Sequence, residues 1–165
     1  MWPRNQMRPL IAIADPHITV KRIRARTDDP LAALITKLQW IASRTKEIDA
    51  VGVVCSGDLT DKSDGFTSLD KRKICQEALF AFSPPIETVI GNHDVPAGNL
   101  AEFPWTNLGS LSSNTIGAVN ILPFDGFKVI GDFLVEGFHW GQDKTSELLE
   151  GKAIDRTKEG LLSVA

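Results

Sequence analysis

Three short polar motifs contain the residues of this sequence that are best suited to bind metal ions. They are Asp15-Pro16-His17, Gly57-Asp58 and Gly91-Asn92-His93-Asp94, and each directly follows an apolar run. Carboxylate, imidazole and amide oxygen groups are typical ligands of divalent metals. If the apolar runs are parallel strands of one sheet, their carboxyl ends lie along one edge and the motifs converge there. The sequence therefore predicts a metal-dependent hydrolase.

The segments between the motifs predict alternating strands and helices. We expect strands over 10–14, 50–55 and 86–90, and helices from Pro30 to about residues 43–46 and over 68–82. Asp29 at the cap and Pro30 in the first turn favour the start of the first helix. The buried face of the second helix is expected to contain Cys75, Ala78, Leu79 and Phe82. This order predicts a parallel sheet with right-handed crossovers.

The second half of the sequence is less regular. We expect a long loop over 95–113, then strands over 116–122 and 127–135 with a turn at Asp125-Gly126. A short helix is expected over 145–152, and residues 160–165 have the pattern of a strand.

Composition indicates a single domain spanning residues 1–165 with an ordinary hydrophobic core. The chain is 42% hydrophobic and 24% charged, and its net charge of −3 gives no overall basic character. No apolar segment is long enough to span a membrane. The two cysteines, Cys55 and Cys75, have no metal-type spacing and are expected in the core. We therefore expect a cytoplasmic protein that does not bind membranes.

In their order and positions, the three motifs resemble the first three signature blocks of the calcineurin-like metallophosphoesterases. The resemblance covers roughly residues 9–96. It implies an α/β fold, the four-layer α/β/β/α sandwich of that family, here incomplete at the C-terminus. It also implies a phosphodiester hydrolase whose nucleophile is a hydroxide activated by two metal ions.

The same resemblance implies a role for each polar residue of the motifs. Asp15 and His17 would bind the first metal, Asp58 would bridge both metals, and Asn92 would bind the second. Oxygen and nitrogen ligands suit Mn²⁺, Fe or Zn²⁺ and do not distinguish among them. Mn²⁺ is the ion we expect first.

The third motif would also supply the acid catalyst. His93 would protonate the leaving group, and Asp94 would orient its ring. Asp61, three residues after Asp58, is open between a site residue and an ordinary loop aspartate.

The sequence departs from the family at its later histidine blocks. It has three histidines, and His139 is followed by Trp140-Gly141 where a further histidine would be expected. We expect His139 to be a packed or surface histidine. The departure favours an N-terminal portion of a longer enzyme over the alternative of a degenerate relative.

The motif details also bear on the substrate. The resemblance implies that a protein serine/threonine phosphatase would have an arginine in the second motif and a glutamate at the end of the third. Here residues 57–61 contain no arginine, and Asp94 stands in place of the glutamate. A basic stretch, Lys21 to Arg26, resembles the layout of the DNA-repair exonuclease branch of the SbcD type, although a solvated loop is the simpler interpretation. This branch implies DNA as substrate and an ATPase-type protein partner.

Two alternatives to the exonuclease interpretation stay open. One is a small-molecule or cyclic-nucleotide phosphodiesterase, and the other is an inactive scaffold of the same fold that binds a protein partner. The four tryptophans are expected to anchor the core or loops, in preference to stacking on bases. They are Trp2, Trp40, Trp105 and Trp140.

Overall fold

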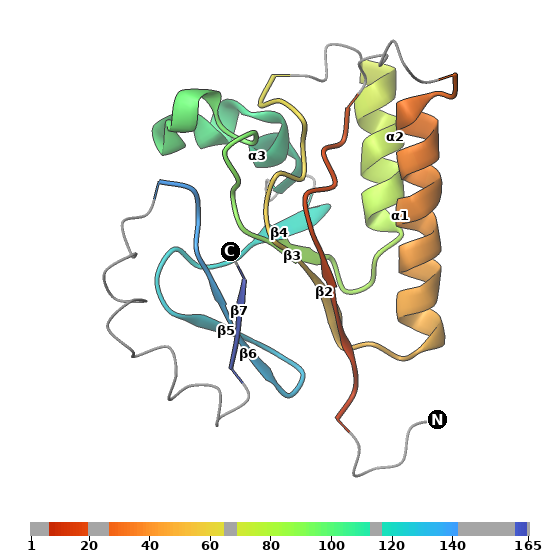
Figure 1. Cartoon of the computed structure of the whole chain (residues 1–165), viewed down its shortest axis with the longest axis vertical. Coiled ribbons are helices and arrows are strands. Elements are labelled where there is room, and N and C mark those ends of the chain that lie inside the picture. Colours follow the sequence, from red (N-terminus) through yellow and green to blue (C-terminus); the bar gives the residue numbers. More distant parts are fainter. Residues whose placement is uncertain (1–6, 20–26, 65–68, 113–116, 142–160, 165) are drawn as a thin grey trace.

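A four-stranded parallel sheet carries the three motifs. The computed structural model describes residues 7–19, 27–64, 69–112, 117–141 and 161–164 (Figure 1). The strands are β1 (Leu10–Ile13), β2 (Gly52–Cys55), β3 (Ile86–Thr88) and β4 (Val119–Ile121), and they lie in that order. All three strand pairs are parallel, which confirms the predicted sheet.

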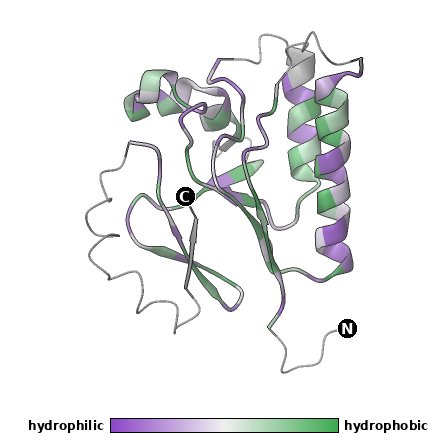
Figure 2. Ribbon diagram, viewed as in Figure 1, coloured by the Kyte–Doolittle hydropathy of each residue, from purple (hydrophilic) through white to green (hydrophobic). Residues whose placement is uncertain are grey.

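Two helices, α1 (Pro30–Glu47) and α2 (Leu69–Phe80), pack together beside this sheet (Figure 1). The Asp29 carboxylate caps α1 by accepting hydrogen bonds from the backbone N–H groups of Leu31 and Ala32. The apolar face predicted for residues 75–82 is buried, with exposed fractions of at most 4%. Figure 2 shows hydrophobic residues along the strands and a mixture of hydrophilic and hydrophobic residues on α1.

A second, three-stranded sheet comprises β5 (Phe127–Ile130), β6 (Phe133–Gly137) and β7 (Leu161–Val164). The prediction of one strand over 127–135 is wrong, because this segment forms the antiparallel hairpin β5–β6. Gly131 has a φ of 59°, a conformation that glycine adopts freely, and with Asp132 it reverses the chain. The predicted strand near residue 160 is confirmed as β7, which pairs parallel with β6.

The four-stranded sheet lies between the helices and the second sheet. On β2, Val53 and Cys55 belong to the core cluster that includes the α1 and α2 residues. Val54 belongs to another cluster, with Ile130 and Val135 of the second sheet. These layers correspond to α/β/β of the expected sandwich. The helix expected over 145–152 lies outside the described residues.

The segment predicted as a loop over 95–113 is helical in three short pieces. It contains two 3₁₀ helices, η1 (Pro96–Gly98) and η2 (Leu100–Trp105), followed by α3 (Asn107–Ser112). The Asn99 side chain accepts a hydrogen bond from Ala101 N–H, and the Thr106 hydroxyl accepts one from Gly109 N–H. Each of these bonds satisfies one free backbone donor at the start of η2 or α3, whereas η1 has no side-chain cap.

Both cysteines are free and buried, as predicted. Within the described part of the chain, no helix has the length and apolar character needed to cross a membrane.

Candidate metal centre

The first two motifs are joined by backbone hydrogen bonds beyond the ends of β1 and β2. His17 N–H donates to Asp58 O at 3.0 Å, and Ile18 N–H donates to Leu59 O at 2.9 Å. Asp61 N–H then donates back to Ile18 O at 3.1 Å. The parallel pairing of the sheet thus continues into the loops and brings the polar residues of both motifs to one edge.

The backbone at this edge is strained. Asp15, His17 and Asp58 have φ angles of 42°, 47° and 46°, in the left-handed region that residues with a Cβ atom rarely adopt. Such strain costs on the order of 1–3 kcal/mol per residue and is concentrated at functional sites. Gly91 allows the third loop to approach closely, since a Cβ atom there would overlap Asp58 Oδ1 and N.

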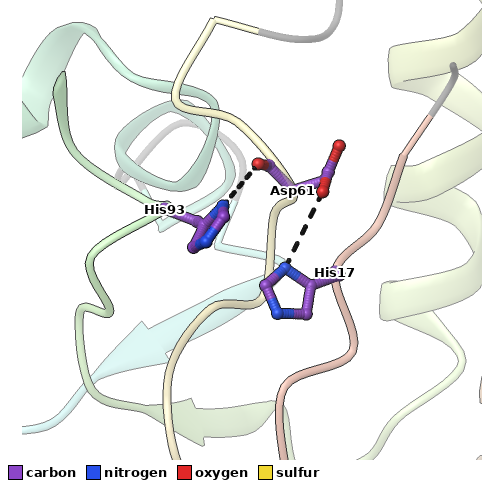
Figure 3. Close-up of side chains that lie close together, drawn as sticks. All are labelled: His17, Asp61 and His93. Carbon is purple, nitrogen blue, oxygen red and sulfur yellow. Dashed lines mark hydrogen bonds and ion pairs between the residues drawn. The ribbon is translucent and has the colours of Figure 1, made fainter.

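The imidazole of His17 has one carboxylate near each of its nitrogens, and Figure 3 shows the one that belongs to Asp61. Its Nε2 atom is 3.9 Å from Asp58 Oδ2, and its Nδ1 atom is 3.9 Å from Asp61 Oδ1. Both distances exceed that of a hydrogen bond. The Nδ1 atom is buried without a hydrogen-bond partner, which is uncommon in folded proteins.

His93 lies against His17, and its backbone is fixed by Asp58. The two rings meet edge to face, with centroids 4.7 Å apart. The backbone N–H of His93 donates to Asp58 Oδ1 at 2.8 Å, and the ring Nδ1 lies 2.9 Å from the carbonyl oxygen of Asp61. A carbonyl oxygen only accepts hydrogen bonds, so Nδ1 carries the proton and Nε2 is the nitrogen that can take up another.

Asp94 is buried and joins the second loop to the third. One carboxylate oxygen accepts hydrogen bonds from the backbone N–H and the hydroxyl of Thr60, and the other accepts one from Gly91 N–H. Burial raises the pKa of Asp94, while these hydrogen bonds act in the opposite direction. The expected contact of Asp94 with the His93 ring is therefore replaced by the contact of that ring with Asp61.

A pocket of about 430 Å³ opens between these loops. Asp15, Asp58 and Asn92 line it, which brings together the residues that the three motifs were predicted to contribute. Among the described residues, no lysine or arginine lines the pocket beside the two carboxylates.

His139 also touches this pocket but has no nitrogen available for a metal. Its Nδ1 accepts a hydrogen bond from Ile90 N–H at 3.0 Å, so Nε2 carries the proton and donates to Leu122 O at 2.9 Å. The side chain is 3% exposed and stacks on Phe124. The prediction of a packed histidine is confirmed.

A comparison of the sequence with models of known protein families identifies the family of this chain. The sequence model of the calcineurin-like phosphoesterases matches residues 8–160. The chain belongs to the calcineurin-like phosphoesterase family. Among curated proteins, none matches it. The family confirms the resemblance and the α/β fold class, and it indicates metal-dependent phosphoester hydrolysis.

The residues of this calcineurin-like phosphoesterase fit divalent cations. Two carboxylates and an amide oxygen line the pocket, and no lysine or arginine of the described residues lines it with them. Nε2 of His17 lies 3.9 Å from one of these carboxylates, that of Asp58, and such oxygen and nitrogen groups bind divalent cations. His17, Asp61 and His93 also place one ligand atom each within 4.8 Å of one another. Asp61 was not assigned a role from sequence, because an aspartate in a loop after a strand is commonplace.

Proposed function

We propose that this protein is a metal-dependent phosphodiesterase that acts on DNA in the manner of an exonuclease. The observation that carries the proposal is the convergence of Asp15, Asp58 and Asn92 in one pocket, with His17 and His93 directly beside Asp58. Family membership supplies the reaction class, phosphoester hydrolysis.

Four residues would hold two metal ions, for which we propose Mn²⁺. Asp15 and His17 would bind the first, Asp58 both, and Asn92 the second. When bound, such ions neutralise phosphate oxygens and lower the pKa of a nucleophilic water. One oxygen of Asp58 already accepts a hydrogen bond from His93 N–H, so its carboxylate orientation is fixed before any cation binds.

Asp61 would serve as a positioning residue for His17. Its carboxylate lies on the Nδ1 side of the imidazole, opposite the Asp58 carboxylate on the Nε2 side. If Nδ1–H points toward Asp61, the lone pair of Nε2 points toward the pocket side occupied by Asp58. This role requires the 3.9 Å separation between His17 Nδ1 and Asp61 Oδ1 to shorten to hydrogen-bond length.

His93 would protonate the leaving oxygen of the substrate. Its Nδ1–H donates to the Asp61 carbonyl, which leaves Nε2 to carry the transferred proton. Asp61 thus contacts both histidines, one through its side chain and the other through its backbone.

The choice of DNA rests on the sequence. The motif residues disfavour a protein phosphatase, and the basic stretch Lys21 to Arg26, which lies outside the described residues, would contact a phosphate backbone. An ATPase-type partner and a cytoplasmic location complete this proposal, and the two free cysteines fit a reducing compartment.

A scaffold without catalytic activity is the second candidate. One observation favours it: both nitrogens of His139 are engaged with backbone groups, so that residue cannot replace the histidines of the family's later blocks. A protein that binds metal and a partner but does not hydrolyse diesters would fit this candidate.

Hydrolysis of bis(p-nitrophenyl) phosphate tests the proposed site. We expect Mn²⁺-stimulated turnover that is abolished in His17→Ala and Asp58→Asn, whereas Asp132→Asn, in the exposed β5–β6 turn, serves as the unaffected control. His93→Ala should lose turnover while it keeps most of the metal. Wild-type rates in both ligand variants would disprove the assignment, and a panel of DNA and small diesters would decide the substrate.

A further inference from the structure

An aromatic segment, Phe138 to Gly141, forms part of the wall of the metal pocket. It lines the same pocket as Asp58 and Asn92. Within it, Trp140 is a large apolar side chain that is 53% exposed. The proposed hydrolysis assigns no role to this indole.

The position of Trp140 relative to the metal loop is fixed by the backbone of Ile90. Trp140 N–H donates to Ile90 O at 2.8 Å, and the preceding residue, His139, accepts a hydrogen bond from Ile90 N–H. Ile90 directly precedes Gly91-Asn92. These two hydrogen bonds to Ile90 therefore fix the backbone of Trp140 beside the loop that contains Asn92.

The indole itself rests against a glycine. A Cβ atom at Gly98 would lie 2.8 Å from Trp140 Nε1, so the edge of the ring packs where residue 98 has no side chain. Gly98 has a φ of 75°, which also favours glycine at this position. This contact supports one edge of the ring while about half of the side chain stays accessible.

Exposure alone does not distinguish this residue. Trp105 is 88% exposed and Trp40 is 67% exposed, yet neither lines the pocket. Trp140 combines an accessible indole, an anchored backbone and a place beside the candidate ligands. Such an indole would recognise an aromatic group that is joined to a phosphate bound in the pocket.

We propose that Trp140 is a stacking platform for an unpaired nucleobase next to the scissile phosphodiester. This inference rests on the proposed function, and it replaces the expectation that Trp140 is only an anchor. The faces of a base within a duplex are covered by its neighbours, so the platform would select a base at a single-stranded end. Stacking on an aromatic side chain raises affinity roughly tenfold per base and tolerates any base sequence.

Equilibrium binding of two short single-stranded oligonucleotides of equal charge tests the proposal. One carries thymine bases and the other carries abasic sugars, and fluorescence anisotropy measures the affinity of each in the presence of Mn²⁺ on His93→Ala protein, to limit hydrolysis. We expect a roughly tenfold preference for the thymine strand. Trp140→Ala should reduce this ratio toward one, Trp140→Phe should keep most of it, and Trp105→Ala should leave it unchanged.

The outcomes separate this inference from the proposed function. A wild-type ratio in Trp140→Ala, or no preference for the thymine strand before mutation, would overturn the stacking role. Thermal unfolding of each variant excludes misfolding, and the phenylalanine variant keeps the test valid if the alanine variant is unstable. Turnover of bis(p-nitrophenyl) phosphate without base preference contradicts the stacking role alone, whereas base preference without turnover contradicts the proposed function alone.

Discussion

At the residue scale, the Asp58 side chain connects two loops of the candidate metal centre. Its Oδ1 atom accepts the backbone N–H of His93, while Oδ2 faces Nε2 of His17. The first oxygen therefore fixes the third loop, and the second remains available for a cation. A left-handed φ of 46° at Asp58 is part of the cost of this arrangement.

The proposed positioning role of Asp61 predicts a loss of metal affinity when its charge is removed. Asp61→Asn should weaken Mn²⁺ binding by 10- to 100-fold, the range that outer partners of ligand histidines contribute. Titration calorimetry on the metal-free protein measures this directly. Asp64→Asn, an exposed residue of the same loop, is the control. Unchanged affinity in Asp61→Asn would show that the 3.9 Å separation from His17 is never closed.

The convergence of the motif residues could be predicted from the sequence, but some of their hydrogen-bond partners could not. Strand ends and polar residues are visible in a sequence, so the convergence of Asp15, Asp58 and Asn92 could be expected. The ring of His93 instead binds a backbone carbonyl, that of Asp61. Every residue has such a carbonyl, so no residue type identifies it, and Asp94 was expected there.

At the scale of elements, a buried carboxylate links the two sheets. Glu87 on β3 is 6% exposed and accepts hydrogen bonds from Asn120 on β4 and Lys128 on β5, at 2.8 and 2.7 Å. Residues 87, 120 and 128 thus join both sheets outside the hydrophobic cluster between them. This tie keeps the second sheet, which leads into Trp140, in place on the first.

Removal of the lysine should therefore destabilise the fold. Lys128→Ala leaves the Glu87 carboxylate buried with one neutral donor, and we expect a loss of about 1–3 kcal/mol in the free energy of unfolding, since the lysine is partly exposed. Urea unfolding measures it. Arg8→Ala, which breaks the exposed Arg8–Asp49 pair, should cost less than about 1 kcal/mol. Equal losses in both variants would contradict the role of burial.

Elements with a regular spacing of apolar residues could be predicted, and elements that depend on local turns and caps could not. The apolar spacing of 31–42 and the cap at Asp29 identify α1, which ends at Glu47, just beyond the predicted range of 43–46. In β5–β6 the apolar run continues through the turn, and only Gly131-Asp132 marks the reversal. The helices of 96–112 depend on local caps at Asn99 and Thr106, which give no apolar period.

At the scale of the whole molecule, two buried thiols should make the free energy of unfolding fall at alkaline pH. Burial raises the pKa of Cys55 and of Cys75 from 9.0 to about 11. Below pH 9 both the folded and unfolded states hold these protons, so their contribution to stability is complete. Between pH 9 and about 11 the unfolded state loses protons first, and the free energy of unfolding falls, by at most about 1.4 kcal/mol per pH unit for each thiol.

Urea unfolding between pH 8 and 11 checks this expectation. The chain has no tyrosine, so phenol groups do not titrate in the same range. Cys75→Ala should reduce the slope of stability against pH by about half, relative to its own stability at pH 8. A slope that is unchanged in this variant would show that other groups, such as the lysines, cause the loss.

Metal binding should stabilise the whole fold, because the ligands come from loops after three different strands. Unfolding separates Asp15, Asp58 and Asn92, so the cation binds only the folded state. At a Mn²⁺ concentration 100 times the dissociation constant, linkage gives about 2.7 kcal/mol, which corresponds to a rise of roughly 5–10 °C in Tm for a chain of this size. Chelation should reverse the rise, and Asp58→Asn should abolish it while Asp132→Asn keeps it. A rise that persists in Asp58→Asn would place the stabilising ion elsewhere.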